Sequence, residues 1–182
     1  MMNRIWSRYT GMAAIGFGGI AALIYLLMIN VTLAHIEAVS GQVPFDMRPF
    51  GYRPADAVEL LDALGAEGRA YYLSQQIPLD TLYPATLALA LVAAMNWFGQ
   101  CMPSCKLVRV GIIFSVGAAL GDYGENLGII AMVWTWPDLP VPLVYATSTA
   151  SIAKSVFTTL AVFLAILIVI VWARLPKAEF RP

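Results

Sequence analysis

The chain has 182 residues, of which 60% are hydrophobic and 12% are charged, about half the charged fraction of an average soluble domain. Its eleven basic and eleven acidic residues balance, so the sequence predicts no basic surface for binding nucleic acid. The single histidine, His35, excludes a bis-histidine haem within one chain and a three-histidine metal site. We predict no cofactor and no metal.

The first predicted membrane helix covers residues 11–34, which are apolar for more than the ~20 residues that span a bilayer. A secretory signal peptide would have a shorter apolar region, so we expect a retained helix. Ala14, Gly18 and Ala22 recur at every fourth position. Such a stripe of small residues predicts close contact with another helix.

Residues 35–79 change in composition and are predicted to lie outside the hydrocarbon. Prolines and glycines break the first half of this segment into turns. Within these turns, Asp46 and Arg48 are predicted to form a local, exposed salt bridge, which contributes under ~1 kcal/mol.

The second half of this segment predicts a pair of short helices over residues 54–76. Apolar residues recur there at helical spacing: Ala57, Leu60, Leu61 and Leu64. Gly65 is expected to end the first helix, and Pro78 to stop the second, which covers roughly residues 66–75. We interpret the pair as an extracytoplasmic amphipathic hairpin on the membrane surface.

Three further apolar segments are long enough to span a bilayer: residues 79–98, 108–136 and 147–172. Trp134 and Trp136 end the second of these as an interfacial aromatic belt. The predicted fold is therefore all-α, a single integral membrane domain over residues 1–182 built as a four-helix bundle.

Cys101 and Cys105 lie in the 99–109 loop and are separated by three residues. This spacing is wider than that of a C-x-x-C redox pair, and two thiols alone do not complete a zinc site. We interpret them as ordinary thiols on the reducing side of the membrane.

The distribution of basic residues predicts the orientation. Two lie in the N-terminal tail, two in the 99–109 loop and three in the C-terminal tail, while residues 137–146 contain none. The positive-inside rule then places both termini inside. We expect a multi-pass protein of a bacterial inner (plasma) membrane, with the lipid bilayer as its constant partner.

A polar stretch interrupts the third predicted span. Asp122, Glu125 and Asn126 are spaced i, i+3 and i+4 and so share one helical face. A charge at bilayer depth costs roughly 2.5–3.5 kcal/mol on insertion scales, so such residues are seldom idle. Glycines at positions 117, 121, 124 and 128 leave room for a neighbouring helix.

Lys154, in the fourth span, is the predicted partner of these acids. At ~1.5 Å per residue, Glu125 and Lys154 fall at matching depths, so we predict an ion pair between them. Asp122 comes level with Thr158. Three hydroxyl side chains share the lysine's face: Ser151, Ser155 and Thr158.

Further polar residues lie near the predicted outer mouth: Asn30, His35, Asp80 and Tyr83. All four spans thus bring polar groups to the outer half of the bundle. This asymmetry predicts a polar pocket that opens outward beneath the 35–79 segment.

The polar cluster permits several functions. In one, its charges only neutralise each other and lock helix register. Because Asp122 and Glu125 outnumber Lys154, either one acid is protonated or another cation visits. Our leading hypothesis is a pocket for a small amphiphile or lipid headgroup. The alternatives are an enzyme on a lipid-soluble substrate with Asp122 or Glu125 as acid/base, a scaffold subunit of an oligomer or larger membrane complex, and a proton path.

Several phrases together form a recognisable pattern. They are Phe45-Asp46 before Gly51-Tyr52, Leu64-Gly65-x-x-Gly68-Arg69-x-x-Tyr72, Leu79-Asp80-x-x-Tyr83-Pro84, Asp122-x-x-Glu125-Asn126, and Lys154. The pattern, which covers about residues 45–160, resembles a group of small, functionally uncharacterised four-span bacterial membrane proteins. The resemblance implies the fold and the cluster but no activity.

Overall fold

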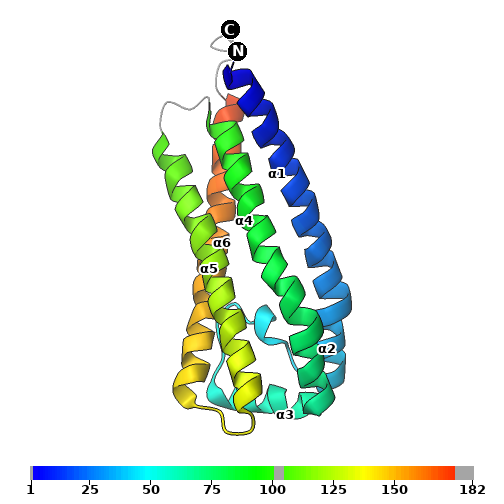
Figure 1. Cartoon of the computed structure of the whole chain (residues 1–182). Helices are drawn as coiled ribbons and strands as arrows, with labels where there is room; N and C mark the ends of the chain where they lie inside the picture. The colour runs from blue at the N-terminus through cyan, green and yellow to red at the C-terminus, as the bar shows by residue number, and fades with distance from the viewer. Residues whose placement is uncertain (1, 101–104, 175–182) are drawn as a thin grey trace.

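A computed structural model describes residues 2–100 and 105–174 (Figure 1). Cys101 and the tail beyond Arg174, on which the cysteine and orientation predictions partly rest, lie outside the described residues. Among the described residues every regular element is a helix. In chain order these are α1 (Met2–Leu27), η1 (Met28–Thr32), α2 (Leu33–Ser40), η2 (Phe45–Met47), α3 (Pro54–Tyr71), η3 (Tyr72–Gln76), α4 (Ile77–Gly99), α5 (Cys105–Thr135) and α6 (Val141–Arg174).

Four stretches of helix are long and apolar enough to cross a membrane: Tyr9–Ser40, Pro54–Gly99, Lys106–Thr135 and Val141–Arg174. Their long parts run side by side as a bundle (Figure 1). The start of α1 and the end of α6 lie together at one end, and α3 lies across the other. We call these the terminus end and the α3 end. The prediction of an all-α fold with four potential membrane helices is confirmed.

The first of these stretches is longer than predicted. It continues through η1, a wide π-type turn, into α2 and ends at Ser40 rather than at residue 34. Gly41 then adopts the left-handed conformation (φ 66°), and its N–H donates to the Glu37 carbonyl. Glycine adopts this conformation readily because it has no Cβ, so it ends the helix cleanly.

The predicted hairpin over residues 54–76 takes a different form. Gly65 (φ 61°, ψ −174°) interrupts α3, as expected of a terminator. Beyond it the chain continues through η3 and past Pro78 into α4, so the predicted stop at Pro78 is wrong. A proline lacks an N–H and crowds the carbonyl four residues before it. The helix continues past Pro78 because the preceding turn is wide: the Ile77 N–H donates to the Tyr72 carbonyl, five residues back.

The helices pack unequally. α5 and α6 share the most extensive contact, followed by α1 with α4 and α4 with α5. The predicted glycine face of α5 lies at the α5–α6 contact, where a Cβ on Gly121 would be 3.0 Å from the backbone N of Lys154. From the predicted stripe on α1, Gly18 faces α4, where a Cβ would lie 4.0 Å from the Ala90 Cβ.

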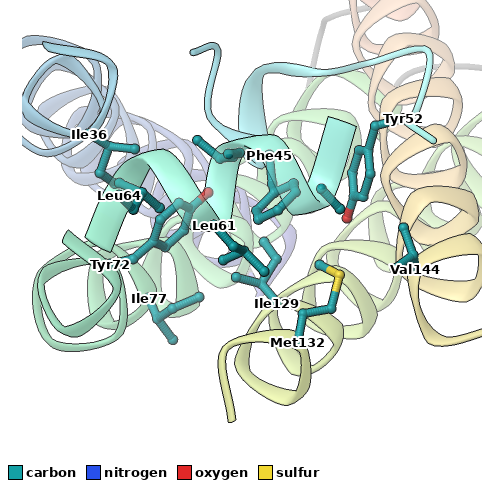
Figure 2. Packing of buried hydrophobic residues seen from close by; sticks show 12 residues of the cluster. Ile36, Phe45, Tyr52, Leu61, Leu64, Tyr72, Ile77, Ile129, Met132 and Val144 are labelled. Atoms are coloured by element: carbon teal, nitrogen blue, oxygen red, sulfur yellow. The ribbon is translucent and has the colours of Figure 1, made fainter. Parts of the chain in front are cut away.

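The α3 end holds a large apolar core, shown in Figure 2. The helical stripe of α3 is buried there, as Ala57, Leu60, Leu61 and Leu64. It packs against side chains from the rest of the bundle, among them Phe45, Tyr52, Tyr72, Ile129, Met132 and Val144. The apolar face that we predicted on the membrane surface is therefore covered by protein, and α3 closes this end of the bundle.

Residues 41–53, which we call the insertion loop, enter the bundle. Figure 1 shows the loop in cyan, nearer to the terminus end than α3 is. The Tyr52 N–H donates to Ser148 Oγ at 2.8 Å, and a Cβ on Gly51 (φ 78°) would lie 3.0 Å from Ile152 Cδ1. Ser148 is seven residues past the first residue of α6, roughly 10 Å along the helix. The loop therefore reaches well below the helix ends.

Candidate functional site

The centre of the site is an ion pair between α5 and α6. Lys154 Nζ pairs with Glu125 Oε2 and lies 3.6 Å from Asp122 Oδ1. The Glu125 side chain is completely buried, and those of Asp122 and Lys154 are only 10% and 12% exposed. Because Gly121 lets the two helices approach closely, the ammonium reaches both acids. The predicted Glu125–Lys154 ion pair is confirmed.

One of the three predicted hydroxyls contacts this ion pair. Ser151 Oγ donates to Glu125 Oε1 at 2.5 Å. Ser155 instead donates to the Ser151 carbonyl of its own helix at 2.9 Å. Thr158 lines a small pocket beside Asp122, in agreement with its predicted depth.

Asp80 brings a further carboxyl group to the ion pair from α4. It is 2% exposed, and its carboxyl lies within hydrogen-bonding reach of those of Asp122 and Asp46. Asn126 Nδ2 donates to the Asp80 main-chain carbonyl at 3.0 Å. That carbonyl has no helical partner because Pro84, four residues later, carries no N–H. Asn126 thus satisfies a backbone acceptor that the proline leaves free.

Asp46 reaches the cluster from the insertion loop, and its predicted salt bridge with Arg48 is wrong. The Tyr72 hydroxyl donates to Asp46 Oδ2 and Gln76 Nε2 to Oδ1, the latter at 3.4 Å. Thr32 in turn donates to Gln76 Oε1 at 2.5 Å. Arg48 Nε donates to the Val43 carbonyl instead, at 2.9 Å. Sequence reasoning from local spacing missed this role, although the Phe45-Asp46 phrase of the resemblance contained the residue.

Two of the predicted residues lie apart from the cluster. Asn30 is exposed and donates to the Leu26 carbonyl of its own helix at 2.8 Å. His35 is exposed, and its ring lies 4.2 Å from that of Tyr71. A third, Tyr83, lies at the edge, stacked on Tyr25 with 5.6 Å between ring centroids.

We use the name acidic cluster for Asp46, Asp80, Asp122, Glu125, Asn126 and Lys154. It contains four carboxyl groups and one ammonium, so full ionisation would leave a net charge of minus three. Uncompensated charge of this size is costly in a medium of low dielectric constant. The cluster therefore holds shared protons, or it attracts a further cation.

Aromatic side chains cover the cluster on the side of the α3 end. Phe45 and Tyr72 are completely buried, and Tyr52 is 6% exposed (Figure 2). The Tyr52 hydroxyl lies near Ser151 without a well-aligned hydrogen bond. Burial, and then the charge of Glu125, raise the pKa of this hydroxyl above its ordinary value, so it stays neutral. The outward opening expected from the sequence stays a prediction.

A small pocket lies beside Asp122, between α4, α5 and α6. Its volume is about 20 Å³, room for roughly one water-sized group. Tyr83, Asp122 and Thr158 supply polar lining, and Leu87 and Leu91 supply apolar walls. Within the described ranges, no group of three or more His, Cys, Asp or Glu is placed to hold a metal ion.

Four oxygens of the cluster are buried without a hydrogen-bond partner: Asp80 Oδ2, Asp122 Oδ1, Glu125 Oε2 and Asn126 Oδ1. Those of Asp122 and Glu125 face the Lys154 ammonium, and the Asp80 carboxyl lies beside those of Asp46 and Asp122. No family model, curated protein or solved structure matches the chain, so the chemistry of the site has to follow from its geometry.

Proposed function

We propose that the protein binds the polar head of a small amphiphile, drawn from the membrane, in the acidic cluster. The observation that carries the proposal is the excess of carboxyl groups, of which those of Asp80, Asp122 and Glu125 are buried and that of Asp46 is half-buried. An ion pair that only locks two helices together needs one acid and one base, as Glu125 and Lys154 supply. Asp46 and Asp80 add two carboxyl groups beyond that pair and Asp122, and they come from two other parts of the chain.

The surroundings of the cluster support the binding of an amphiphile, because they are largely apolar. Phe45 and Tyr72 exclude solvent on one side. On the other side, the pocket beside Asp122 is bordered by Leu87 and Leu91; its volume admits only the polar end of a ligand, and a hydrocarbon chain would extend from it into the bilayer. A polar end and apolar walls together favour an amphiphilic ligand over a free ion. We also propose an inner-membrane location with both termini inside, from the distribution of basic residues.

Thermal unfolding of the purified protein in nanodiscs tests this proposal. A panel of alkyl amines, fatty acids, fatty alcohols, phospholipids and quinones is added to the wild type, to Glu125→Gln and to Glu67→Gln. Glu67 is an exposed residue of α3 and is the matched control. We expect one class to raise the unfolding temperature of the wild type and of Glu67→Gln but not of Glu125→Gln. The absence of any saturable shift across the panel would contradict the proposal.

A second function has one observation in its favour. The carboxyl of Asp80 lies within hydrogen-bonding reach of those of Asp46 and Asp122, and adjacent carboxyl groups in a buried site share protons. Such a set supports an enzyme in which Asp122 or Glu125 acts as acid/base on a bound amphiphile. Incubation in deuterated water, followed by mass spectrometry of the extracted lipids, would reveal deuterium on carbon or a new product. Asp80→Asn should abolish either signal.

A further inference from the structure

The tip of the insertion loop carries a large apolar side chain that the rest of the described chain leaves uncovered. Phe50 is 92% exposed, more than any other large apolar side chain among the described residues. Its neighbour Gly51 packs against α6, where a Cβ would lie 3.0 Å from Ile152 Cδ1, and the Tyr52 N–H donates to Ser148 Oγ. The backbone beside Phe50 is thus fixed to the bundle, so the ring faces its surroundings from a defined position.

The depth of Phe50 follows from the length of α6. This helix has 34 residues, about 51 Å at 1.5 Å per residue, whereas the hydrocarbon core of a bilayer is about 30 Å thick. At the terminus end, α6 closes with Trp172 and Arg174, residue types that lie at a membrane interface. Counting about 30 Å back from Trp172, roughly 20 residues, reaches Ile152. Because Gly51 packs against Ile152, Phe50 lies where the hydrocarbon meets the headgroups at the α3 end.

The first membrane stretch gives the same level. It begins at Tyr9, and roughly 20 residues from there reach Ile29. The next residue, Asn30, is exposed. An exposed amide suits the headgroup level and is costly in hydrocarbon. Two helices therefore place the outer boundary of the hydrocarbon beside the tip of the insertion loop.

Two arginines flank Phe50 in the chain, Arg48 and Arg53. Within the described ranges neither forms an ion pair. Arg48 uses Nε to bond the Val43 carbonyl, which leaves its two terminal amino groups for another partner. Arg53 is exposed, and Asp56, the nearest acid along the chain, accepts from its main-chain N–H. Both guanidinium groups can therefore bind an anion at the level of the headgroups.

We infer that the tip of the insertion loop, residues 48–53, binds an anionic phospholipid in the leaflet at the α3 end, an inference that rests on the membrane location proposed above. The Phe50 ring lies among the first acyl carbons, and the guanidinium groups of Arg48 and Arg53 bond the lipid phosphate. Guanidinium and phosphate form charge-assisted, bidentate hydrogen bonds. Two cations favour a headgroup of net negative charge over a zwitterionic one.

A photo-reactive side chain at the tip identifies the lipid that it contacts. Benzoylphenylalanine replaces Phe50 in one protein and Phe163 in another. Phe163 is an exposed residue of α6, roughly 16 Å deeper than Ile152 along the helix. Each protein is placed in nanodiscs of phosphatidylcholine and phosphatidylglycerol in equal amounts, irradiated and analysed by mass spectrometry. We expect lipid adducts at both positions, with phosphatidylglycerol favoured at least threefold at position 50 and not favoured at position 163.

Variants of the arginines locate the headgroup contact. In Arg48→Gln/Arg53→Gln, the adducts at position 50 should return to the composition of the nanodisc. Arg109→Gln, at an exposed position of α5, is the matched control and should leave the preference unchanged. Arg53→Gln alone should at least halve the preference, and it remains informative if Arg48→Gln disturbs the loop through loss of its bond to Val43.

The outcomes separate this inference from the proposals above. Lipid adducts at position 163 but none at position 50 would overturn it, since the tip would then lie in water. Adducts at position 50 without a preference for phosphatidylglycerol would also overturn it, since the arginines would then select no headgroup. Loss of the preference in Glu125→Gln would attribute the lipid to the acidic cluster instead. The lack of lipid adducts at both positions would contradict the membrane location itself.

Discussion

The two ends of the bundle hold their helices together in different ways. At the α3 end, the acidic cluster joins α4, α5, α6 and the insertion loop through ion pairs and hydrogen bonds. At the terminus end, a smaller core is formed by Met95, Ala161 and Ile168 with apolar neighbours. There, Phe98 packs edge-on to Trp172 with ring centroids 5.0 Å apart.

This difference has a physical meaning in a membrane. Lipid tails solvate an apolar side chain about as well as a helix surface does, so helix association relies on close packing and polar bonds. The terminus end uses packing alone among its buried residues. The α3 end adds directed bonds, which specify one arrangement of the helices and whose loss is costly. The predictions below test this contrast in decreasing order of expected effect.

The largest effect is expected from Lys154→Met, which leaves the buried carboxyl groups of Glu125 and Asp122 without a counter-charge. Removing one partner of a buried ion pair costs about 3–5 kcal/mol of unfolding free energy. Unfolding by sodium dodecyl sulfate in mixed micelles, followed by circular dichroism, measures the change. Lys106→Met, at an exposed position of α5, should change stability by under ~0.5 kcal/mol. Equal effects of the two variants would show that the ion pair does not hold the α3 end.

Asp46→Ala should have the next largest effect. It leaves the buried Tyr72 hydroxyl and Gln76 amide without their acceptor, at about 1–3 kcal/mol for each such group. The same unfolding titration measures the loss, with Asp62→Ala on the exposed face of α3 as the control. If Asp46→Ala were as stable as the control, the hydrogen bonds of Asp46 would not be what holds the insertion loop in place.

Alanine substitutions of two glycines compare the ends directly. A Cβ on Gly121 would lie 3.0 Å from the backbone N of Lys154, whereas one on Gly111 would overlap the flexible Met95 thioether. Backbone cannot move aside and methionine can, so Gly121→Ala should cost about 1–3 kcal/mol and Gly111→Ala less. Gly19→Ala, with no atom within 4 Å of the added Cβ, is the control. A larger loss for Gly111→Ala in the same unfolding titration would reverse the comparison.

The smallest effect is expected for Asn30→Leu, since Asn30 is exposed and bonds only its own helix. Its unfolding free energy should stay within ~0.5 kcal/mol of the wild type. Asn126→Leu, which frees the Asp80 carbonyl, should cost about 1–3 kcal/mol in the same measurement. If both variants lost a similar amount of unfolding free energy, Asn30 would also belong to a polar network that stabilises the bundle.

The depth of a residue in the bundle was predictable from the sequence, whereas the direction in which its side chain leaves the helix was not. Counting ~1.5 Å per residue put Glu125 and Lys154 at one level, and the glycine face of α5 indicated which side meets α6. The position of Asn30 at the end of the first span put it at the outer mouth with the other polar residues. The side chain instead turns away and donates to the Leu26 carbonyl of its own helix, and position along the chain does not record this direction.

Loops and prolines account for most of the remaining errors. Asp46 reaches the site on a loop, and no periodic pattern predicts where a loop folds. Pro78 was expected to end a helix because it lacks an N–H, but a wide turn before it absorbs the defect. Pro84 also lacks an N–H, and the Asp80 carbonyl that it leaves free accepts a hydrogen bond from Asn126 instead.

The contact between the insertion loop and α6 constrains the order of events during synthesis. The Tyr52 N–H bonds Ser148, which follows it by 96 residues. The ribosome adds about 5–20 residues each second, so the loop waits several seconds for this partner to be translated. During that interval the Tyr52 N–H lacks its native acceptor, whereas the partners of Asp46, Tyr72 and Gln76, have already been translated. Folding of the insertion loop must therefore include a late step in which this early segment docks onto α6.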